Sequence, residues 1–248
     1  MEAAALDELR ASEDEHWWFR ARRRALRPLV QTALELAPPG PVLDLGCGTG
    51  GNLAHLFGGT RRTLLGLDRE PVALAHCARR TAHVSGPDAW KLLRAEGCRL
   101  PLADGSVAVI SAFDLLEHLP DDAACLREIA RVLAPGGQLI ASVPAWPALW
   151  SAHDEALSHV RRYARGELEQ RLAGAGLELE RRRGFNLLLL PPIALVRWLR
   201  RDANGTDFRP TSPLASTALA ALFAVERALQ RCLGLPLGLS LCVRARRG

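Results

Sequence analysis

The stretch VLDLGCGTGGN, residues 42–52, joins an apolar run to a glycine-rich loop, and the helical pattern NLAHLF continues from it. A strand, a glycine loop and a helix in this order begin a βαβ unit, so this stretch decides the fold. Glycines let the chain turn sharply and let a ligand approach the backbone, while amides at a helix start favour polar or anionic groups. We therefore predict a ligand site where the first strand ends.

The glycine loop fits two spacing patterns at once. Gly46, Gly48 and Gly51 have the G-x-G-x-x-G spacing of dinucleotide-binding loops, which alone is weak evidence. Asp44 and Gly50 complete a second pattern, D-x-G-x-G-x-G. A carboxylate two residues before the first glycine suits a cationic ligand group and is poorly placed against a pyrophosphate. The flanking acids therefore favour the second pattern.

Apolar runs and helical stretches alternate along the rest of the chain. The runs TLLGLD, AWKLLRAE and SVAVISAFD end at or near Asp68, Glu96 and Asp114, and helices are expected over residues 71–80 and 121–133. Strands and helices that alternate at this spacing form a parallel sheet covered on both faces. With QLIASVPA, LELERRRGFN and LGLSLCVRARR as further strands, we predict an α/β fold with a doubly wound, seven-stranded, mostly parallel sheet.

The prediction assigns the whole chain, residues 1–248, to one domain. A helical stretch covers roughly residues 2–37 and ends at the turn signal Pro38-Pro39-Gly40. Two apolar helical stretches precede the last strand. The expected parts are an N-terminal helical lid (1–39), a core sheet (40–186), a helical insertion or cap (187–236) and a last strand (237–248).

The composition bounds the partners and the compartment. The net charge is +5, but Lys91 is the only lysine, so the arginine excess is compositional and no nucleic-acid partner is expected. The six cysteines form no C-x-x-C pair and no zinc-like spacing with histidine, so no metal site is predicted. Scattered thiols, an acidic N-terminus and apolar runs too short to span a bilayer fit a cytoplasmic protein.

Several segments together resemble a known family. DLGCGTG, GLD, AEGCRLPLADGS, FDLLEHLPD and RVLAPGGQL fall in order over residues 42–144, each at a strand end. Together they resemble a class I S-adenosylmethionine-dependent methyltransferase, which has a Rossmann-like sheet. EDEHWWFRARRR before the loop and AHDEALSHVRRYAR after the fifth strand resemble one bacterial subgroup of that family, of small-molecule type.

The resemblance implies S-adenosyl-L-methionine as cofactor, S-adenosyl-L-homocysteine as product, and a set of cofactor contacts. Asp68, with Arg69 beside it, would hold the ribose hydroxyls. Glu96 and Gly97 stand where family members commonly read G-D-A and contact the adenine, so the longer acid departs from the pattern. The residues expected around the methionine part are Asp44, Gly46, Cys47, Gly48, Gly50 and Phe113.

Methyl transfer from a sulfonium needs alignment of two reactants and exclusion of water, and a general base only when the acceptor must lose a proton. The candidate catalytic residues are His118, just past the fourth strand, and His153 and His159, past the fifth. An acid between two histidines suits a base or a metal site, although the spacing is no recognised ligand pattern. The alternative for each histidine is packing or hydrogen bonding within its loop.

Four aromatic side chains, HWWF at residues 16–19, begin the N-terminal helix in a chain that is otherwise poor in aromatics. One interpretation is a lid over the cofactor, with Trp17 as its aromatic wall and Arg20 or Arg22 at the methionine carboxylate. The other is an anchor between this helix and the sheet. The two interpretations are compatible.

In this family the sixth strand runs parallel to the first five and the seventh returns antiparallel. The insertion at residues 187–236 would then start at the carboxyl edge, where ligands of open α/β sheets bind. We expect it to cover a small-molecule or lipid-like acceptor, with Arg197, Arg200 and Arg201 suited to peripheral contact with a membrane surface. A helical cap or homodimer interface is the alternative. Two other functions stay open: an NAD-dependent oxidoreductase and a nucleoside-binding protein without turnover.

Overall fold

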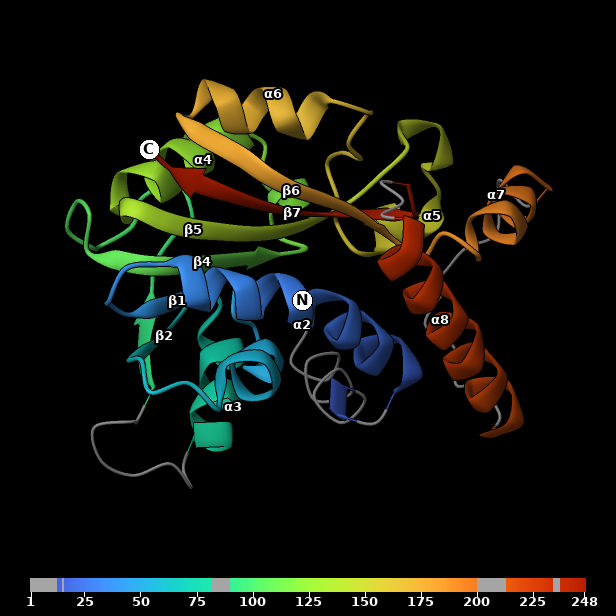
Figure 1. The fold of residues 1–248 in the computed structure, drawn as a ribbon, viewed down its shortest axis with the longest axis horizontal. Coiled ribbons are helices and arrows are strands. Elements are labelled where there is room, and N and C mark those ends of the chain that lie inside the picture. Colours follow the sequence, from blue (N-terminus) through green and yellow to red (C-terminus); the bar gives the residue numbers. More distant parts are fainter. Residues whose placement is uncertain (1–12, 15, 82–89, 200–212, 234–236) are drawn as a thin grey trace.

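The computed structural model describes residues 13–14, 16–81, 90–199, 213–233 and 237–248. In this part of the chain, seven strands form one sheet: β1 (Val42–Leu45), β2 (Leu64–Asp68), β3 (Lys91–Arg94), β4 (Val107–Phe113), β5 (Leu133–Pro144), β6 (Leu177–Phe185) and β7 (Ser240–Arg247). Their order is β3-β2-β1-β4-β5-β7-β6 (Figure 1). Strands β1 to β5 pair in parallel, and β7 is antiparallel to both β5 and β6. The fold class predicted from the sequence is confirmed.

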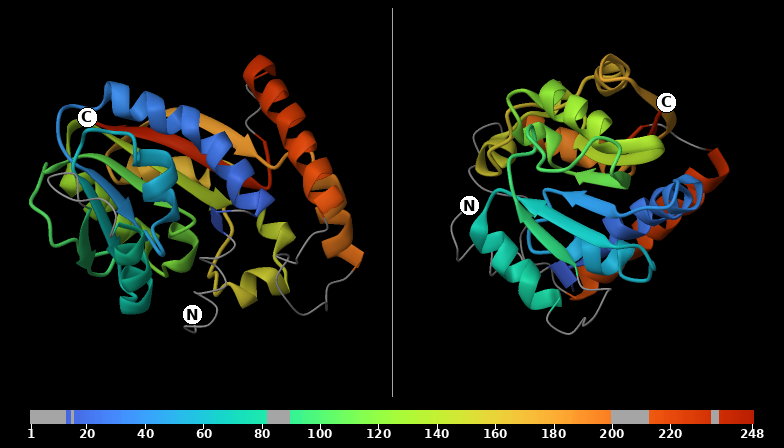
Figure 2. Two further views of the ribbon diagram at one scale, coloured as in Figure 1. Left: turned by 90° about the horizontal axis from the view of Figure 1, so that it is seen from below. Right: turned by 90° about the vertical axis from the view of Figure 1, so that its left-hand side faces the viewer.

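Helices cover both faces of the sheet (Figure 2), which is why β1 and β4 are buried along their whole length and are apolar except at Asp44 and Ser111. Leu126 of α4 (Asp122–Val132) and Leu168 of α6 (Glu167–Gly174) belong to one core cluster. Leu26 of α2 (Trp17–Leu36), Phe57 of the π-helix η1 (Leu53–Phe57) and Cys77 of α3 (Pro71–Thr81) belong to the other. The two clusters sandwich the sheet.

The strand order reverses between β1 and β4. Ligands of open α/β sheets bind outside the carboxyl ends of the strands at such a switch point. The glycine loop follows β1 directly, and Asp114 follows β4. The residues that the sequence singles out are therefore brought to the edge of the sheet where a ligand is expected.

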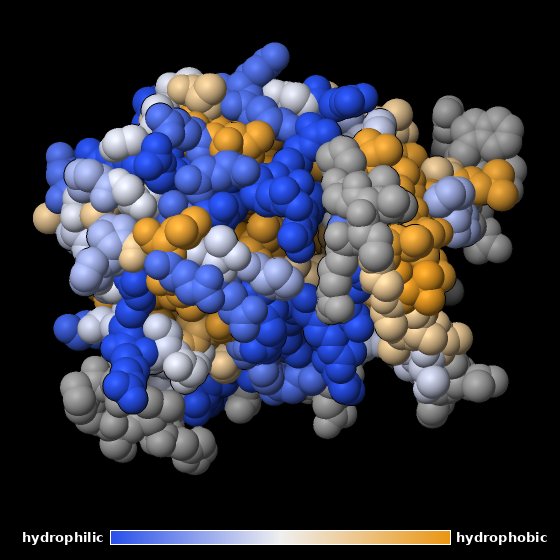
Figure 3. Space-filling model, viewed as in Figure 1, coloured by the Kyte–Doolittle hydropathy of each residue, from blue (hydrophilic) through white to orange (hydrophobic). Residues whose placement is uncertain are grey.

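The connection between β6 and β7 contains two helices, α7 (Leu190–Leu199) and α8 (Pro213–Leu233), as predicted. It leaves the sheet at the carboxyl end of β6, and α7 contacts the short helix η3 (Pro147–Leu149) after β5. Helix α8 lies against the start of α2 (Figure 1). Figure 3 shows apolar surface along α8, to which Val225 and Leu229 contribute.

Local boundaries differ from the expected ones in three places. Helix α2 begins at Trp17, because His16 has extended backbone angles and its Nδ1 accepts a hydrogen bond from the amide of Trp18. The expected helix over residues 2–12 lies outside the described residues. The NLAHLF stretch is a π-helix, and β3 ends at Arg94, two residues before Glu96. In the described part of the chain, every helix is too short or too polar to cross a membrane.

Candidate active site

The glycine loop is shaped by backbone hydrogen bonds to the end of β2. The amides of Gly46 and Cys47 donate to Leu67 O at 2.8 and 3.0 Å, and the amide of Gly48 donates to Asp68 Oδ2 at 2.9 Å. Gly46, Gly48 and Gly50 all have positive φ, which side chains rarely adopt. A Cβ at Gly48 would meet no atom within 4 Å, so the backbone faces open space there. The loop can therefore be approached by a ligand at Gly48.

Asp44 lies at the base of this loop with only 1% of its surface exposed. Ser111 Oγ donates a hydrogen bond to Asp44 Oδ1 at 2.6 Å, while Oδ2 is buried and has no partner among the described residues. Burial raises the pKa of this carboxyl to about 7. A buried acceptor oxygen without a partner is costly, so the site is suited to a ligand that brings a cationic or hydrogen-bond-donating group.

The other two predicted acids line up along the same edge. Both carboxylate oxygens of Asp68 accept backbone amides, from Gly48 and from Glu70, each at 2.9 Å. Glu96 is exposed just beyond β3, and the preceding amide, of Ala95, donates to Asp68 O at 3.2 Å. Glu96 follows β3, Asp68 ends β2 and Asp44 lies in β1, so the three acids stand on neighbouring strands. The ligand roles that the sequence suggests for the half-buried Asp68 and the exposed Glu96 stay predictions.

Two further predicted residues flank these acids. Arg69 is exposed and pairs with the neighbouring Glu70 at 3.2 Å. Gly97 lies against Cys125, whose Sγ would be 3.5 Å from an added Cβ. Cys47 is a buried residue of the loop, and the hydrogen bond with the Cys77 thiol, followed by burial, raises the pKa of its thiol. The Cys47 thiol is therefore protonated, and its side chain packs in the core.

Arg22 reaches the carboxyl end of β4 from helix α2. Its Nη2 lies 2.6 Å from Asp114 Oδ2 and donates to Ser142 Oγ at 3.2 Å, and Ser142 Oγ donates to Asp114 Oδ1 at 2.7 Å. The guanidinium also lies over the ring of Phe113, 5.6 Å from its centroid. Asp114 has φ +52°, a strained conformation of the kind found at functional sites. The predicted residues Arg22 and Phe113 thus meet at this edge, whereas Arg20 is exposed.

The N-terminal aromatic residues make the contacts expected of an anchor. Trp17 stacks on Phe223 of α8 with 5.7 Å between ring centroids, and Trp18 packs on Phe185 at the end of β6 at 5.2 Å. Phe185 and Phe223 stack on each other at 5.3 Å. The HWWF segment therefore joins helix α2 to the insertion. The indole Nε1 of Trp17 is buried without a hydrogen-bond partner among the described residues.

Glu13 covers the glycine loop, which the sequence did not indicate. Its carboxylate accepts the hydroxyl hydrogen of the buried Thr49 and pairs with Arg80 Nη2 at 2.9 Å. An added Cβ at Gly51 would lie 2.7 Å from Glu13 Oε2. The side chain of Glu13 thus lies directly against Gly51, where the helix after the glycine loop begins. A single acidic residue in an acidic N-terminus gave no signal for this contact.

Two of the three candidate catalytic histidines lie together. His118 ends the 3₁₀ helix η2 (Leu116–His118) after β4, and its ring centroid is 4.9 Å from that of His159. His118 Nδ1 lies 3.3 Å from Ser158 O, and His159 Nδ1 lies 3.0 Å from Asp154 Oδ1. His153 lies on α5 (Ala152–Ala156) and is not part of this cluster.

Glu117 is the member of this cluster that the sequence did not indicate. It is 1% exposed, and its Oε2 is buried with no hydrogen-bond partner among the described residues. One ligand atom each from Glu117, His118 and His159 lie within 4.8 Å of one another. Burial, and then the nearby charge of Asp114, raise the pKa of Glu117 well above its usual value; burial lowers the pKa of His118.

Asp154 holds the loop that carries His159. It is fully buried, forms a capping box with Ser151 at the start of α5, and accepts a hydrogen bond from Arg162 Nε at 2.7 Å. Arg162 Nη1 also donates to Ala145 O, after β5, at 3.1 Å. The HD and H-x-RRY segments therefore form one network. An anion-binding role for Arg162 is not needed to explain it.

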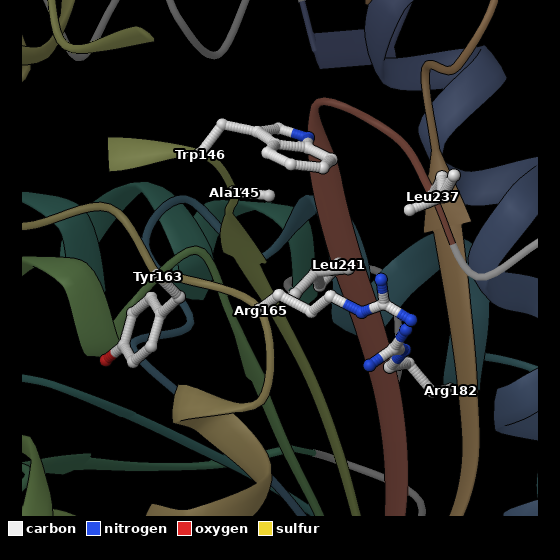
Figure 4. A pocket seen from close by; sticks show the side chains of 7 residues that line it. All are labelled: Ala145, Trp146, Tyr163, Arg165, Arg182, Leu237 and Leu241. Carbon is white, nitrogen blue, oxygen red and sulfur yellow. The ribbon is translucent and has the colours of Figure 1, made fainter. Parts of the chain in front are cut away.

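Two cavities lie near the insertion. One of about 170 Å³ is enclosed by α2, the end of β6, β7 and α8; its lining includes Arg24, Arg183, Phe185, Phe223, Gln230 and Cys242. The other, of about 20 Å³, has room for about one water molecule. Figure 4 shows its arginines, Arg165 and Arg182, close together, with the hydroxyl of Tyr163 directed away. That hydroxyl donates to Asp122 Oδ2 at 2.6 Å, so the smaller cavity is a packing gap.

Comparisons with known proteins agree with this geometry. A family model described as "Methyltransferase domain" matches residues 18–181. A "Probable S-adenosylmethionine-dependent methyltransferase" of Mycolicibacterium smegmatis is 32% identical over 169 residues, which are 67% of this chain and 62% of that protein. The matched part of this chain spans only 53% to 62% of the length of the first three relatives.

Solved structures share the fold at lower identity. An S-adenosylmethionine-dependent methyltransferase from Mesorhizobium loti superimposes with a TM-score of 0.60 and 20% identity, over 90% of this chain and 98% of that one. Geranyl diphosphate C-methyltransferase from Streptomyces coelicolor gives a TM-score of 0.60 and 17% identity, over 89% of this chain and 79% of that one. At these identities the similarity supports the architecture alone.

Proposed function

The chain belongs to the methyltransferase domain family, and from this premise we propose that it transfers a methyl group from S-adenosylmethionine to a small-molecule acceptor. The observation that carries the proposal is the buried Oδ2 of Asp44, without a partner at the base of the glycine loop. S-adenosylmethionine brings a sulfonium and an ammonium group, and either satisfies such an oxygen. The donor set fits this cofactor.

The remaining cofactor contacts follow from the order of the acids along the edge. In the proposed complex the methionine part lies over Gly48, where the backbone is open, and the ribose hydroxyls lie at Asp68. Glu96 accepts a hydrogen bond from the adenine amino group. Arg22 has guanidinium hydrogens beyond those used by Asp114 and Ser142, and they are available to the methionine carboxylate.

This site is less suited to bind a nicotinamide dinucleotide. Its pyrophosphate would lie over the glycine loop, where the carboxylates of Asp44, Asp68 and Glu13 supply negative charge. Arg80 donates to Thr49 O of this loop at 2.9 Å, but its charge is already paired with Glu13 and Asp14. Family membership also favours the methyl donor. The remaining alternative is a protein that binds the nucleoside without turnover. An assay for methyl transfer to an acceptor distinguishes it from an enzyme.

The histidine cluster marks the acceptor side of the site. The methyl group moves in line from sulfur to the acceptor atom, so the acceptor must lie opposite the sulfur, close to the carboxyl end of β4. His118 and His159 follow β4 and β5 and lie there with Glu117. We assign them to contact the acceptor; His153, outside the cluster, stays a prediction.

The 170 Å³ cavity is the candidate space for the body of the acceptor. It adjoins the cofactor edge, because Cys242 in its wall is the sheet partner of Ser142, which bonds to Asp114. Phe185 and Phe223 give it apolar walls, and Arg183 Nε and both polar atoms of Gln230 are buried without hydrogen-bond partners among the described residues. An acceptor with an apolar body and a polar or anionic group suits this lining.

Four sequence-based expectations stay predictions. The subgroup indicated by HWWF and H-x-RRY, a lipid-like acceptor, peripheral membrane contact and a homodimer are each untested. Arg200 and Arg201 lie outside the described residues, and α8 exposes Val225 and Leu229. Flotation with anionic vesicles tests membrane contact: absence of binding, with full activity on a soluble acceptor, excludes it.

A crystal structure with S-adenosylhomocysteine tests the proposed cofactor site. We expect the ligand between the glycine loop and Asp68, with its amino group near Asp44 and its adenine near Glu96. A vacant site at saturating ligand, or a diphosphate bridging the glycines, would contradict the proposal.

A further inference from the structure

We propose that Glu117, His118 and His159 bind one first-row divalent metal ion at the carboxyl edge of β4 and β5. Two ligands come from the loop after β4, and the third comes from the loop after α5. One ligand atom from each residue lies within 4.8 Å of the others. The inference rests on the proposed function only for what the ion does there, and the ion can be detected without any methyl transfer.

Hydrogen bonds fix the tautomer of both histidines. Ser158 O can only accept, so the Nδ1 of His118 must carry the hydrogen of the 3.3 Å contact. The ionised carboxylate of Asp154 likewise accepts from His159 Nδ1 at 3.0 Å, because Asp154 also pairs with Arg162. Each ring is left with a lone pair on Nε2. Imidazoles that ligate metals are typically held in this way, by a carbonyl or a carboxylate on the other nitrogen.

Glu117 supplies an independent observation that points to a cation. Its carboxyl group is buried with one oxygen unpartnered among the described residues, and the carboxylate of Asp114, which pairs with Arg22, lies nearby. A buried carboxylate with no partner is expensive. A bound metal ion would satisfy the oxygen, neutralise the charge and take up the Nε2 lone pairs of the two histidines.

The distances and donor types limit the ion. Metal–nitrogen and metal–oxygen bonds are about 2.0–2.2 Å, so ligand atoms on one ion lie about 3–4 Å apart, and modest side-chain rotation closes the cluster. Three protein ligands leave at least one position open for water or substrate. Two imidazoles with one carboxylate favour Zn²⁺, Fe²⁺, Co²⁺ or Ni²⁺ over Mg²⁺, which prefers oxygen ligands.

With such an ion, the acceptor would be a molecule whose oxygen binds at the open coordination position of the metal. Coordination lowers the pKa of a bound hydroxyl, which gives its proton to solvent. The acceptor oxygen then forms a bond to the methyl carbon as the sulfur–carbon bond breaks, and the electron pair of that bond stays on sulfur, giving neutral S-adenosylhomocysteine. In this arrangement His118 and His159 are ligands, and Asp154 is a positioning residue that acts through His159.

Cobalt titration of the full chain, freed of metal by a chelator and carrying no affinity tag, tests the site. We expect one bound Co²⁺ per chain. Its absorption in the visible should be stronger than that of the hydrated ion, as is typical of Co²⁺ in a low-symmetry site. Glu117→Gln and His159→Ala should abolish this signal, and Asp154→Asn should weaken binding about 10–100-fold. The matched control is His153→Ala, which removes a histidine from the adjacent helix α5, outside the cluster, and should keep the stoichiometry.

Binding of S-adenosylhomocysteine by the same samples shows that each variant is folded and separates the two proposals. Wild-type protein that binds the nucleoside and takes up no Co²⁺ overturns the metal site and leaves the cofactor proposal intact. Co²⁺ binding as tight in Glu117→Gln and His159→Ala as in the wild type also overturns it. Co²⁺ uptake that depends on Glu117 and His159, in a protein that does not bind the nucleoside, supports the metal site and contradicts the proposed function.

Discussion

Arg22 on the N-terminal helix forms a 2.6 Å ion pair with Asp114, the residue that follows β4. Ser142 on β5 hydrogen-bonds to both partners, so three distant parts of the chain meet at one point of the sheet edge. Asp114 adopts a left-handed conformation there. Helix α2, which precedes the glycine loop, is thereby fixed to the end of β4, the strand beside β1 in the sheet. This junction lies next to the proposed methyl donor.

Replacing Arg22 should loosen this junction. Arg22→Ala leaves Asp114 and Ser142 without their cation, and we expect a loss of about 1–3 kcal/mol in the free energy of unfolding. We also expect weaker binding of S-adenosylmethionine. Denaturant unfolding measures the first effect and calorimetry the second. Arg20→Ala is the matched control, because Arg20 is exposed on the same helix; equal effects for both variants would refute the role of the ion pair.

The aromatic cluster should hold the insertion against the N-terminal helix. Phe223 is 2% exposed and stacks on both Trp17 and Phe185. Phe223→Ala should lower the free energy of unfolding by about 3–5 kcal/mol. Val225→Ala, at a position on α8 that is 54% exposed, should change it by less than about 0.5 kcal/mol. If Phe223→Ala left the free energy of unfolding unchanged, α8 would not be held to α2 through this aromatic cluster.

Substitutions at two glycines of the loop should distinguish effects on ligand binding from effects on the stability of the fold. Gly48→Ala strains a residue with φ +53° but meets no atom within 4 Å, so it should cost about 1 kcal/mol of stability while blocking ligand approach. Gly50→Ala places its Cβ 2.6 Å from Cys77 Sγ and should cost about 2–4 kcal/mol. Thermal unfolding without ligand ranks the two variants. The reverse ranking would contradict the geometry.

Asp44 should lower the stability of the ligand-free protein as the pH rises. Its folded pKa of about 7 lies above the ordinary value of 3.8, so folding favours the protonated form, and stability falls between these two values. Asp44→Asn removes this dependence. The free energy of unfolding of the variant, relative to that of the wild type, should rise by up to about 4 kcal/mol between about pH 4 and about pH 7. Above about pH 7 this difference should rise no further. Denaturant unfolding along a pH series measures the difference; a constant difference would mean that Asp44 titrates normally.

Much of the fold follows from local patterns in the sequence. Alternating apolar runs and helical stretches, with acids at the strand ends, predicted the seven strands and the insertion before β7, because period and glycine placement are local properties. The same local patterns place the acids Asp44, Asp68 and Glu96 at one edge of the sheet, and their ligand roles stay predictions. Parallel strands bring residues that end neighbouring strands to one edge, so position along the chain implied position in space.

Other parts of the site could not be read from local patterns. Glu117 looked like one more acid in a loop, and its burial beside His159 depends on how the loops after β4 and β5 pack together. Glu13 contacts Thr49 through a tertiary hydrogen bond with no sequence signature. Trp17 stacks on Phe223, more than two hundred residues away, so this anchoring contact could be recognised only in the structure.

The most direct test of the central claim, that Asp44 faces a cationic methionine group, is titration calorimetry with S-adenosylmethionine and with NAD. We predict that the wild type binds S-adenosylmethionine and not NAD, and that its affinity rises from about pH 6 to about pH 8 as Asp44 ionises. Asp44→Asn should weaken binding at least about tenfold at the higher pH, and its affinity should no longer rise with pH. Binding of NAD in preference to S-adenosylmethionine, or equal affinity of wild type and Asp44→Asn for S-adenosylmethionine, would contradict the account.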